Sequence, residues 1–508
     1  MPERRRFGML PRFLLGAILV VAFTTAAGAA IAIGTISQIA ADIALGGKQI
    51  HSPALTQPAP GSAQTIMVIG DDHSGPVING VRLLHADTFM LIRLDPQHAQ
   101  TSILSIPRDL LISFTHNGVP YANQKFNAAY AVGGPDLVLR VVKQTLPGVS
   151  INDVVDFSFA SFIGVVRAIG CVYVDVDHRY LNPVGDSYSA INLQPGYQRL
   201  CANSALSYVR YRHTDSDFVR VARQQDFIRQ AKEQLGLFDL LTKYDQIAKA
   251  LGKAIDTNIR GVKTVNDLLN LIAFSSSRPI RHVTFLTSNQ EAVINGEDYV
   301  TSTPAMIRQS VDSFLYENPT APAPAGSVAT GTPTHATHAH HHHHSSAGSS
   351  AISAPDLFAL TAANQPAALQ LAPSVPFPVL LPRFETGEAT ANDPSGPNDA
   401  RAYTIADESG HLYQGYRVDW QQNVGGYYGI EGTDWLNPPL FANPSATLTI
   451  HGRKYMFIDD GSHWHDIGWR SGNALYWVSN TLLEDLSNAQ MLALAESAQP
   501  LTGLGGTG

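Results

Sequence analysis

The sequence predicts an α/β protein followed by a small α+β domain. Apolar, β-branched runs are typical of buried strands, and longer helical patterns follow them. The strands are expected at residues 65–70, 88–94 and 100–106, and the helices at 135–146, 157–168 and 218–237. Residues 375–498 instead alternate short strands with turns. The chain of 508 residues exceeds one typical domain of roughly 100–200 residues, which agrees with two folded parts.

A membrane anchor is predicted ahead of the first strand. Four arginines among residues 1–12 precede an uncharged apolar run at 13–36, which is longer than the ~20 residues that span a bilayer. The positive-inside rule puts the arginines in the cytoplasm and the later chain outside, so we expect a single-pass cell-membrane protein. Residues 37–64 would form a stalk. A signal peptide cleaved near 26–30 is the alternative, which the continuing apolar run disfavours.

Composition and cysteine content bear on partners and compartment. The formal net charge is -8, which argues against general nucleic-acid binding, because that function usually needs a basic domain. Cys171 and Cys201 are the only cysteines, and outside the cytoplasm such a pair is normally oxidised. We therefore expect a disulfide that ties the strand after Cys171 to the segment after Cys201. A metal or nucleophile role is disfavoured because no histidine flanks either cysteine at ligand spacing.

Charged residues stand at the ends of the three predicted strands. Asp72 follows the first strand, Asp87 precedes the second, and Arg108 and Asp109 follow the third. If the strands are neighbours, Asp72, Asp87 and Arg108 gather in one place. Paired carboxylates beside an arginine fit a site for Mg²⁺ and a diphosphate. The alternative is that Asp72 caps a loop and Asp109 merely pairs with Arg108.

A second group of charges is denser. Four arginines fall within 14 residues, at positions Arg210, Arg212, Arg220 and Arg223. Residues 208–212 read as a strand end, and the helix after them puts Asp217, Arg220 and Gln224 on one face. Inward arginines at a helix N-terminus fit an anion pocket. A structural network of Arg210, Arg212 and Arg220 with Asp215, Asp217 and Asp226 explains this stretch equally well.

Several blocks of the sequence carry a family resemblance. They read VIGDDHSG, HADTFMLIRL, SIPRDL, KFNAAYAVGG, DVVDFSFASFIGVVRAIG and ALSYVRYRHTDSDFVRVARQQ. In this order they resemble the LytR-CpsA-Psr family of bacterial cell-wall glycopolymer ligases, over residues 65–237. The resemblance implies an αβα sandwich with a central mixed sheet, in a catalytic domain at 65–316. It also implies transfer of a glycopolymer-1-phosphate from a polyprenyl diphosphate to a peptidoglycan hydroxyl.

The resemblance also implies roles for particular residues. Asp72 and Asp87 would hold Mg²⁺ or Mn²⁺, and Asp217 would be a supporting carboxylate. The catalytic set is Arg108, Arg210, Arg212 and Asp217. The substrate-binding set is Arg108, Lys125, Asn127, Arg210, Arg212, Arg220, Arg223 and Gln224. Ser74 and His85 stand where the family commonly has arginine, so one phosphate contact is in doubt. No residue is assigned as the base.

The rest of the chain is read from composition. Residues 317–374 are expected to be a disordered linker with a histidine tract, and residues 499–508 a tail. All five tryptophans lie in the domain at 375–498, where a core role is favoured over sugar stacking. The sequence SHWHD at 462–466 is a partial metal-ligand set with no further ligand evident.

Two other functions remain open at this point. One is a non-catalytic, wall-anchored regulator or scaffold that binds anionic glycopolymer lipids through the same arginines. The other is a polyprenyl-diphosphate hydrolase, because water can replace the acceptor hydroxyl in such a site.

Overall fold

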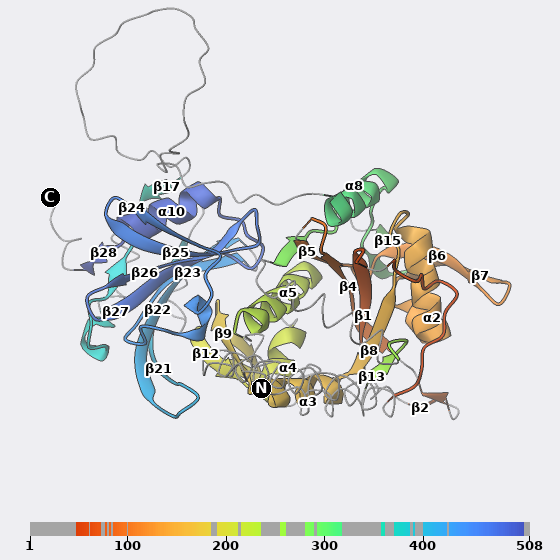
Figure 1. Cartoon of the computed structure of the whole chain (residues 1–508), viewed down its shortest axis with the longest axis horizontal. Coiled ribbons are helices and arrows are strands. Elements are labelled where there is room, and N and C mark those ends of the chain that lie inside the picture. The colour runs from red at the N-terminus through yellow and green to blue at the C-terminus, as the bar shows by residue number, and fades with distance from the viewer. Residues whose placement is uncertain are drawn as a thin grey trace, which may run out of the picture.

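The computed structural model contains an N-terminal domain, from β1 to α8, and a C-terminal domain, from β17 to β28 (Figure 1). It describes residues 47–59, 61–72, 77–78, 81–82, 85–98, 100–183, 190–211, 215–234, 255–260, 280–288, 292–316, 357–360, 370–386, 390–391, 400–423 and 426–501. Among these residues no helix is both long and apolar enough to cross a membrane, and the span predicted at 13–36 lies outside them.

A six-stranded mixed sheet forms the centre of the N-terminal domain, as expected. Its strands run in the order β13-β8-β1-β4-β5-β14, with parallel pairs at β1–β8 and β5–β14 and antiparallel pairs elsewhere. Their bounds are β1 Gln64–Asp72, β4 His85–Asp95, β5 Gln100–Ser105, β8 Asp153–Ser158, β13 Ile255–Thr257 and β14 Ile280–Val283. The three strands predicted first are therefore adjacent, because short connections between them favour antiparallel pairing.

Helices cover both faces of this sheet, which makes the sandwich (Figure 1). On one face, alternate residues such as Phe89 and Leu91 pack with α2 (Ala128–Thr145) and α8 (Pro304–Tyr316). On the other face, Met90 and its neighbours pack toward α5 (Asp217–Gln234). This alternation follows from the two-residue period of a strand. Helix α2 begins earlier than predicted and bends at Gly133 and Gly134, just before Pro135.

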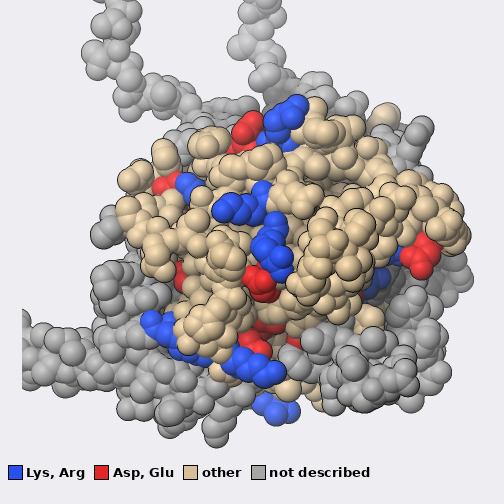
Figure 2. Space-filling view, turned by 90° about the vertical axis from the view of Figure 1, so that its right-hand side faces the viewer, with Lys and Arg blue, Asp and Glu red and all other residues tan. Residues whose placement is uncertain are grey.

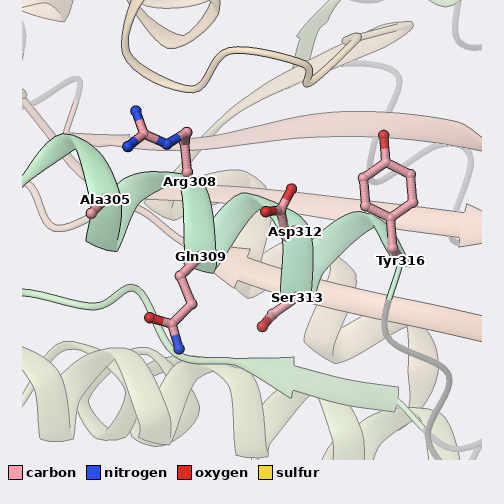
Figure 3. Close-up of a pocket in the computed structure, with 6 residues that line it drawn as sticks. All are labelled: Ala305, Arg308, Gln309, Asp312, Ser313 and Tyr316. Atoms are coloured by element: carbon pink, nitrogen blue, oxygen red, sulfur yellow. The ribbon is translucent and has the colours of Figure 1, made fainter.

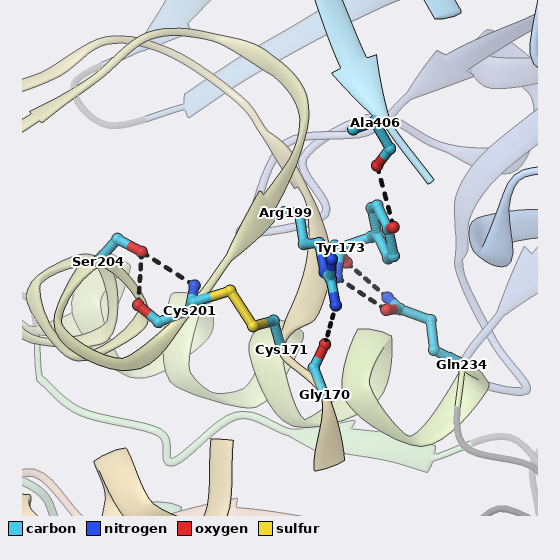
Figure 4. The surroundings of a disulfide bond; sticks show 8 residues. All are labelled: Gly170, Cys171, Tyr173, Arg199, Cys201, Ser204, Gln234 and Ala406. Carbon is cyan, nitrogen blue, oxygen red and sulfur yellow. Dashed lines mark hydrogen bonds between the residues drawn. A yellow bond between two sulfur atoms is a disulfide. The ribbon is translucent and has the colours of Figure 1, made fainter. Parts of the chain in front are cut away.

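A smaller unit extends the domain beyond the sheet. It contains α3 Phe159–Ile169, β9 Val172–Val176, β12 Gly196–Leu200 and α4 Ala202–Arg210, with the first turns of α5 against them. The structure joins Cys171 to Cys201 in a disulfide, as predicted (Figure 4). Arg199 donates a 2.7 Å hydrogen bond to the Gly170 carbonyl next to it. The disulfide therefore closes the β9–β12 ribbon beside the start of α4.

Several short two-stranded sheets lie outside the central sheet of the N-terminal domain. They are β2 Val77–Ile78 with β3 Val81–Arg82, β6 Leu111–His116 with β7 Val119–Lys125, β10 Tyr180–Asn182 with β11 Ile191–Leu193, and β15 Ala292–Ile294 with β16 Glu297–Tyr299. The β6–β7 hairpin projects beside α2 (Figure 1). Figure 2 shows that on this side of the molecule acidic and basic side chains are interspersed among uncharged ones.

The C-terminal domain is an eight-stranded antiparallel sheet with one α-helix, α10 Asn488–Ser497, packed on it. Its strands are β20 Thr390–Ala391, β21 Ala400–Ala406, β22 Leu412–Asn423, β23 Gly426–Thr433, β24 Ala446–Ile450, β25 Arg453–Asp459, β26 Trp464–Ser471 and β27 Ala474–Ser479. The 3₁₀ helices are Ala372–Ser374 and Pro439–Phe441. All five tryptophans are buried, so the core role is confirmed.

The two domains share a buried interface. Tyr173 of β9 and Tyr197 of β12 pack into one cluster with Trp435 and Trp477 of the C-terminal domain. The Tyr173 hydroxyl donates a 3.1 Å hydrogen bond to the Ala406 carbonyl (Figure 4). Because apolar contact and specific hydrogen bonds coincide, the second domain is docked on the first rather than merely attached through a linker.

Four predictions about chain organisation need correction. Residues 208–210 end helix α4 and form no strand. Residues 47–59, predicted as stalk, pack on the domain and bury Ile50 and Ala54. The predicted linker contributes β17 Leu357–Ala359, paired with β19 Phe384–Thr386. The predicted tail begins with β28 Gln499–Pro500, paired with β18 Leu380–Leu381. Local composition did not predict these contacts, because the segments that these residues pair or pack with are distant in the sequence.

Candidate functional site

Strand ends bring the first group of charges together. In the antiparallel β1–β4 pair, Asp72 lies opposite His85, two residues before Asp87. Arg108 follows β5, and its Nη1 donates to Asp87 Oδ1 at 2.5 Å. The predicted gathering of Asp87 and Arg108 is therefore confirmed. The side chain of Asp72 lies outside the described residues, so its part in a metal site stays a prediction.

The N-terminus of α5 joins this group. Asp217 is the first residue of α5, and its Oδ1 lies 2.5 Å from Arg220 Nη2 and 3.9 Å from Arg108 Nε. Arg220 also donates a 3.3 Å hydrogen bond to the Asp87 carbonyl. The two charged stretches, more than 100 residues apart in sequence, therefore form one cluster.

Arg210 and Gln224 border the cluster from the helical side. Arg210 is the last residue of α4, with its guanidinium 3.9 Å from the Phe159 ring centroid. Gln224 donates to the Val209 carbonyl at 3.1 Å and accepts from Thr88 Oγ1 at 3.4 Å. Gln224 thereby links α4, α5 and β4, which fixes the spacing between the arginines and the strand that carries Asp87.

Asp109 connects the site to the β7–α2 turn. Arg108 Nε lies 3.2 Å from Asp109 Oδ2, and Lys125 Nζ lies 3.2 Å from Asp109 Oδ1. The Asn127 backbone N–H donates to the Arg108 carbonyl at 3.0 Å. The simple Arg108–Asp109 pairing considered from sequence thus exists alongside the contact with Asp87. Asp109 was not assigned to the site from sequence, although its position next to Arg108 was the available signal.

The pKa values of the two aspartates Asp87 and Asp217 shift in opposite directions. Burial raises the pKa of Asp87, but the charges of Arg108, Arg220 and Arg210 outweigh burial, so the pKa lies below its ordinary value. Burial raises the pKa of Asp217, and the two nearby arginines offset only part of that rise. Asp87 is thus held as a carboxylate, as a metal ligand must be, and its side chain is 34% exposed.

Arg223 does not belong to this cluster. Its side chain is fully buried, and its three guanidinium nitrogens donate to Asp215, the Tyr180 hydroxyl and the carbonyls of Tyr208 and Tyr211. This corrects its assignment to the substrate-binding set, because a side chain with no exposed surface offers no N–H group to a ligand. Asp215 therefore pairs with Arg223, which was not part of the structural network considered from sequence, whereas the Arg220–Asp217 pair of that network does form. Arg212 and Ser74 lie outside the described residues.

A buried acid pair lies beneath the site and was missed from sequence. The Tyr130 hydroxyl donates to Asp71 Oδ2 at 2.6 Å and to Asp156 Oδ2 at 2.9 Å. Burial raises the pKa of Asp156 to about 8, and the neighbouring Asp71 contributes to the rise. Asp71 precedes Asp72, so this network holds the end of β1 against α2 and β8.

Two hollows near these elements differ in character. The larger, about 440 Å³, runs along α8 and is lined by Arg308, Asp312, Tyr316 and their neighbours on that one helix (Figure 3). None of these residues belongs to the arginine cluster. A smaller, mostly apolar cavity of about 90 Å³ borders Pro107 and Asp217. The arginine cluster and the larger hollow are therefore separate features of the domain.

Comparison with known proteins identifies the family. The model of the LytR_cpsA_psr family matches residues 32–312, more than half of the chain. The chain belongs to the LytR_cpsA_psr family. The match includes every residue of the arginine cluster and ends within α8, so the C-terminal domain lies beyond it.

Relatives within the LytR_cpsA_psr family are distant. The chain is 27% identical over 240 residues to the polyisoprenyl-teichoic acid–peptidoglycan teichoic acid transferase TagT of Bacillus subtilis, covering 46% of this chain and 68% of TagT. It is 29% identical over 197 residues to TagU of Bacillus cereus, covering 38% of this chain and 60% of TagU. The crystal structure of Bacillus subtilis TagV aligns with a TM-score of 0.42 and 24% identity over 50% of this chain and 97% of TagV. Across four such curated relatives the chain spans between 45% and 68% of their length.

Proposed function

We propose that this protein transfers a glycopolymer-1-phosphate from a polyprenyl diphosphate carrier to a peptidoglycan hydroxyl. Family membership supports this reaction class, and the relatives TagT and TagU are named as teichoic acid transferases. The proposal includes the membrane anchor at 13–36, which keeps the site outside the cytoplasm and beside the lipid carrier.

The convergence of three arginines on Asp87 carries the proposal. Arg108 comes from the loop after β5, Arg210 from the end of α4 and Arg220 from the first turns of α5. A diphosphate undergoing transfer gathers negative charge on the oxygens of the transferring and leaving groups. Fixed guanidinium groups stabilise that charge, and removal of one such donor typically costs about 10²–10³ in rate.

The balance of charge favours an anion. Four cationic side chains (Arg108, Arg210, Arg220, Lys125) meet three carboxylates (Asp87, Asp109, Asp217) among the described residues. Asp217 touches two of the arginines and acts as a positioning residue, since its carboxylate fixes where their N–H groups point. An entering diphosphate would take over part of this pairing.

The donor set also fits a hard divalent cation. Asp72 and Asp87 would hold Mg²⁺ or Mn²⁺, because carboxylate oxygens suit these ions and Asp87 stays ionised. The bound ion would supply further stabilisation of phosphate charge. The arginines orient the diphosphate, and the polyprenyl phosphate leaves.

Reconstituted transfer tests the proposal. The full chain in detergent receives a polyprenyl-diphosphate-linked saccharide, a peptidoglycan oligosaccharide and MgCl₂, and product and polyprenyl phosphate are measured. We expect joined product with the wild type and none with Asp87→Ala at equal folded content. Undiminished product from Asp87→Ala would overturn the metal assignment.

The same assay separates the two other functions. A binding protein would retain the lipid and release no polyprenyl phosphate with any divalent ion. A hydrolase would release polyprenyl phosphate at the same rate with and without the peptidoglycan acceptor. Either result would replace the transferase proposal.

A further inference from the structure

Two histidines from different domains meet at the domain interface. His282 lies in β14, the edge strand of the N-terminal sheet, and His465 lies in β26 of the C-terminal domain. Their ring centroids are 5.6 Å apart. The Nε2 atom of each ring is shielded from solvent and has no hydrogen-bond partner in the structure. Leaving a buried polar atom without a hydrogen-bond partner destabilises the folded protein, so two such atoms side by side indicate a ligand that would bind both.

A carboxylate from a third segment lies against the same histidines. Glu484 Oε1 is 3.3 Å from His465 Nδ1, and its Oε2 is 3.0 Å from His463 Nδ1. The Glu484 backbone has φ of 59°, in the left-handed region that side-chain-bearing residues rarely adopt. Such strain is held by the surrounding structure and clusters at ligand sites.

A second carboxylate is available next to it. Asp460 is 1% exposed, and its Oδ2 atom has no hydrogen-bond partner in the structure. Its Oδ1 accepts the backbone N–H groups of Ser462 at 2.7 Å and His463 at 2.6 Å. These bonds fix the Asp460 side chain. Its Oδ2 atom lies 3.9 Å from His463 Nδ1, so the carboxylate adds negative charge beside the histidines.

The geometry of these residues is that of a metal-ligand group. One ligand atom each from His282, His465 and Glu484 lies within 4.8 Å of the other two, and Asp460, His463 and Glu484 form a second group within the same limit. Zn²⁺ binds imidazole nitrogens and carboxylate oxygens at about 2.0–2.2 Å in tetrahedral sites. Two neutral imidazoles with two carboxylates would neutralise a divalent cation in this buried setting.

A small cavity next to the two histidines is bordered by arginines that already have partners. It measures about 30 Å³ and is lined by His282, His465 and polar neighbours from both domains. Arg229 lines it and is paired with Asp226, Glu233 and Asp466, the last at 3.6 Å. Arg417 lines it too and is paired with Asp175, Asp419 and Glu431. Both positive charges are thus compensated by their own partners.

We propose that His282, His465 and Glu484 bind a Zn²⁺ ion at the interface between the two domains, and that the nearby Asp460 carboxylate helps to balance its charge. The ion joins strand β14 of the N-terminal domain to β26 and to the segment after β27 of the C-terminal domain. His463 contacts the second oxygen of Glu484 and orients that carboxylate. This site is separate from the arginine cluster, and its role is to fix the C-terminal domain on the edge of the catalytic sheet.

Zinc uptake by the full chain tests the site. The seven histidines at 335, 338 and 340–344 also bind Zn²⁺, so the measurement uses a tract-free chain in which all seven are serine. The detergent-purified chain is stripped with EDTA and dialysed against dilute ZnCl₂, and zinc is counted by mass spectrometry. We expect one tightly held zinc per chain, and a tract-free chain that takes up none would overturn the proposal.

Variants at the interface assign the ligands. In the tract-free chain, His282→Gln and Glu484→Gln should each weaken zinc affinity about tenfold or more. His451→Gln is the matched control, because His451 is 75% exposed and pairs with Glu496 outside the group. Unchanged affinity in both ligand variants would assign the zinc elsewhere and refute the site.

Thermal unfolding gives a second readout that does not depend on activity. EDTA should lower the melting temperature of the tract-free chain, because loss of a ligand that binds only the folded state removes its stabilisation. EDTA should leave the melting temperature of His282→Gln unchanged. An equal EDTA effect in both proteins would show that the ion does not sit at His282.

Discussion

Two arginine–carboxylate clusters in this protein each gather three carboxylates and differ in their cations and their exposure. Among the described residues, four cations meet three carboxylates at the candidate site, and Asp87 is one-third exposed. At the domain interface, Arg417 is the arginine that pairs with Asp175, Asp419 and Glu431, all buried. The first cluster has positive charge and exposed surface to offer an anion. The second has neither.

The pKa directions follow the same contrast. The arginines around Asp87 outweigh burial and lower its pKa, whereas burial raises the pKa of Glu431 well above its ordinary value because one arginine serves three carboxylates. An arginine surrounded by carboxylates is therefore no sign of function by itself. The number of carboxylates that fold onto it, and the surface that remains exposed, decide its role.

The largest expected effect on stability comes from the interface cluster. Arg417→Ala leaves three buried carboxylates without their cation, and loss of one partner of a buried pair typically costs about 3–5 kcal/mol. Urea unfolding should show a loss of this size. Arg470→Ala, at an exposed arginine bonded to Asn437, should change stability little. Equal effects of the two variants would contradict the structural role of Arg417.

A large effect on activity, with little on stability, is expected at the site. Arg108→Gln should lower transfer about 10²–10³-fold, because one charged donor to the diphosphate is lost. Arg93→Gln is the matched control, since Arg93 is 19% exposed and pairs with Asp95, as Arg108 is 18% exposed and pairs with Asp87. Equal transfer by the two variants would remove Arg108 from the mechanism.

A substitution of Arg223 distinguishes a structural role of this buried arginine from a role in transfer. Arg223→Lys keeps the charge but loses most of the hydrogen bonds to the α4–α5 connection, so we expect a stability loss of about 2 kcal/mol. Transfer per folded molecule should remain close to that of the wild type. A selective loss of transfer, with unfolding unchanged, would return Arg223 to the substrate-binding set.

The buried acid pair beneath the site, Asp71 and Asp156, should make the free energy of unfolding depend on pH. Its folded-state pKa of about 8 exceeds the ordinary value of 3.8, so folded Asp156 keeps a proton that the unfolded chain releases. Stability should therefore fall as pH rises from about 4 to 8. Asp156→Asn should gain on the wild type as the pH rises from 5 to 8, by up to about 1.4 kcal/mol per pH unit in urea unfolding. A constant difference would contradict the raised pKa, and Asp136→Asn, on the surface of α2, is the control.

Sequence patterns predicted much of the N-terminal domain. The first three strands are short apolar runs, so their existence was predicted correctly, and the adjacency that the site required as a condition holds in the structure. The disulfide followed from two cysteines and an expected oxidising compartment. The end of α4 was read as a strand because aromatic residues alternate with arginines there, a local signal that tertiary packing overrode.

In the candidate site, the sequence by itself determined which chemical groups are present: arginines, aspartates and a glutamine at strand ends and on one helix face. Only the tertiary structure decided that Arg108 and Arg220 meet at Asp87, that Arg223 turns into the interior, and that His282 meets His465 across two domains. The physical reason is that a local pattern fixes the direction of a side chain within its own element. Its partner, its burial and its remaining charge come from other elements of the fold, some of them more than 100 residues away in the sequence.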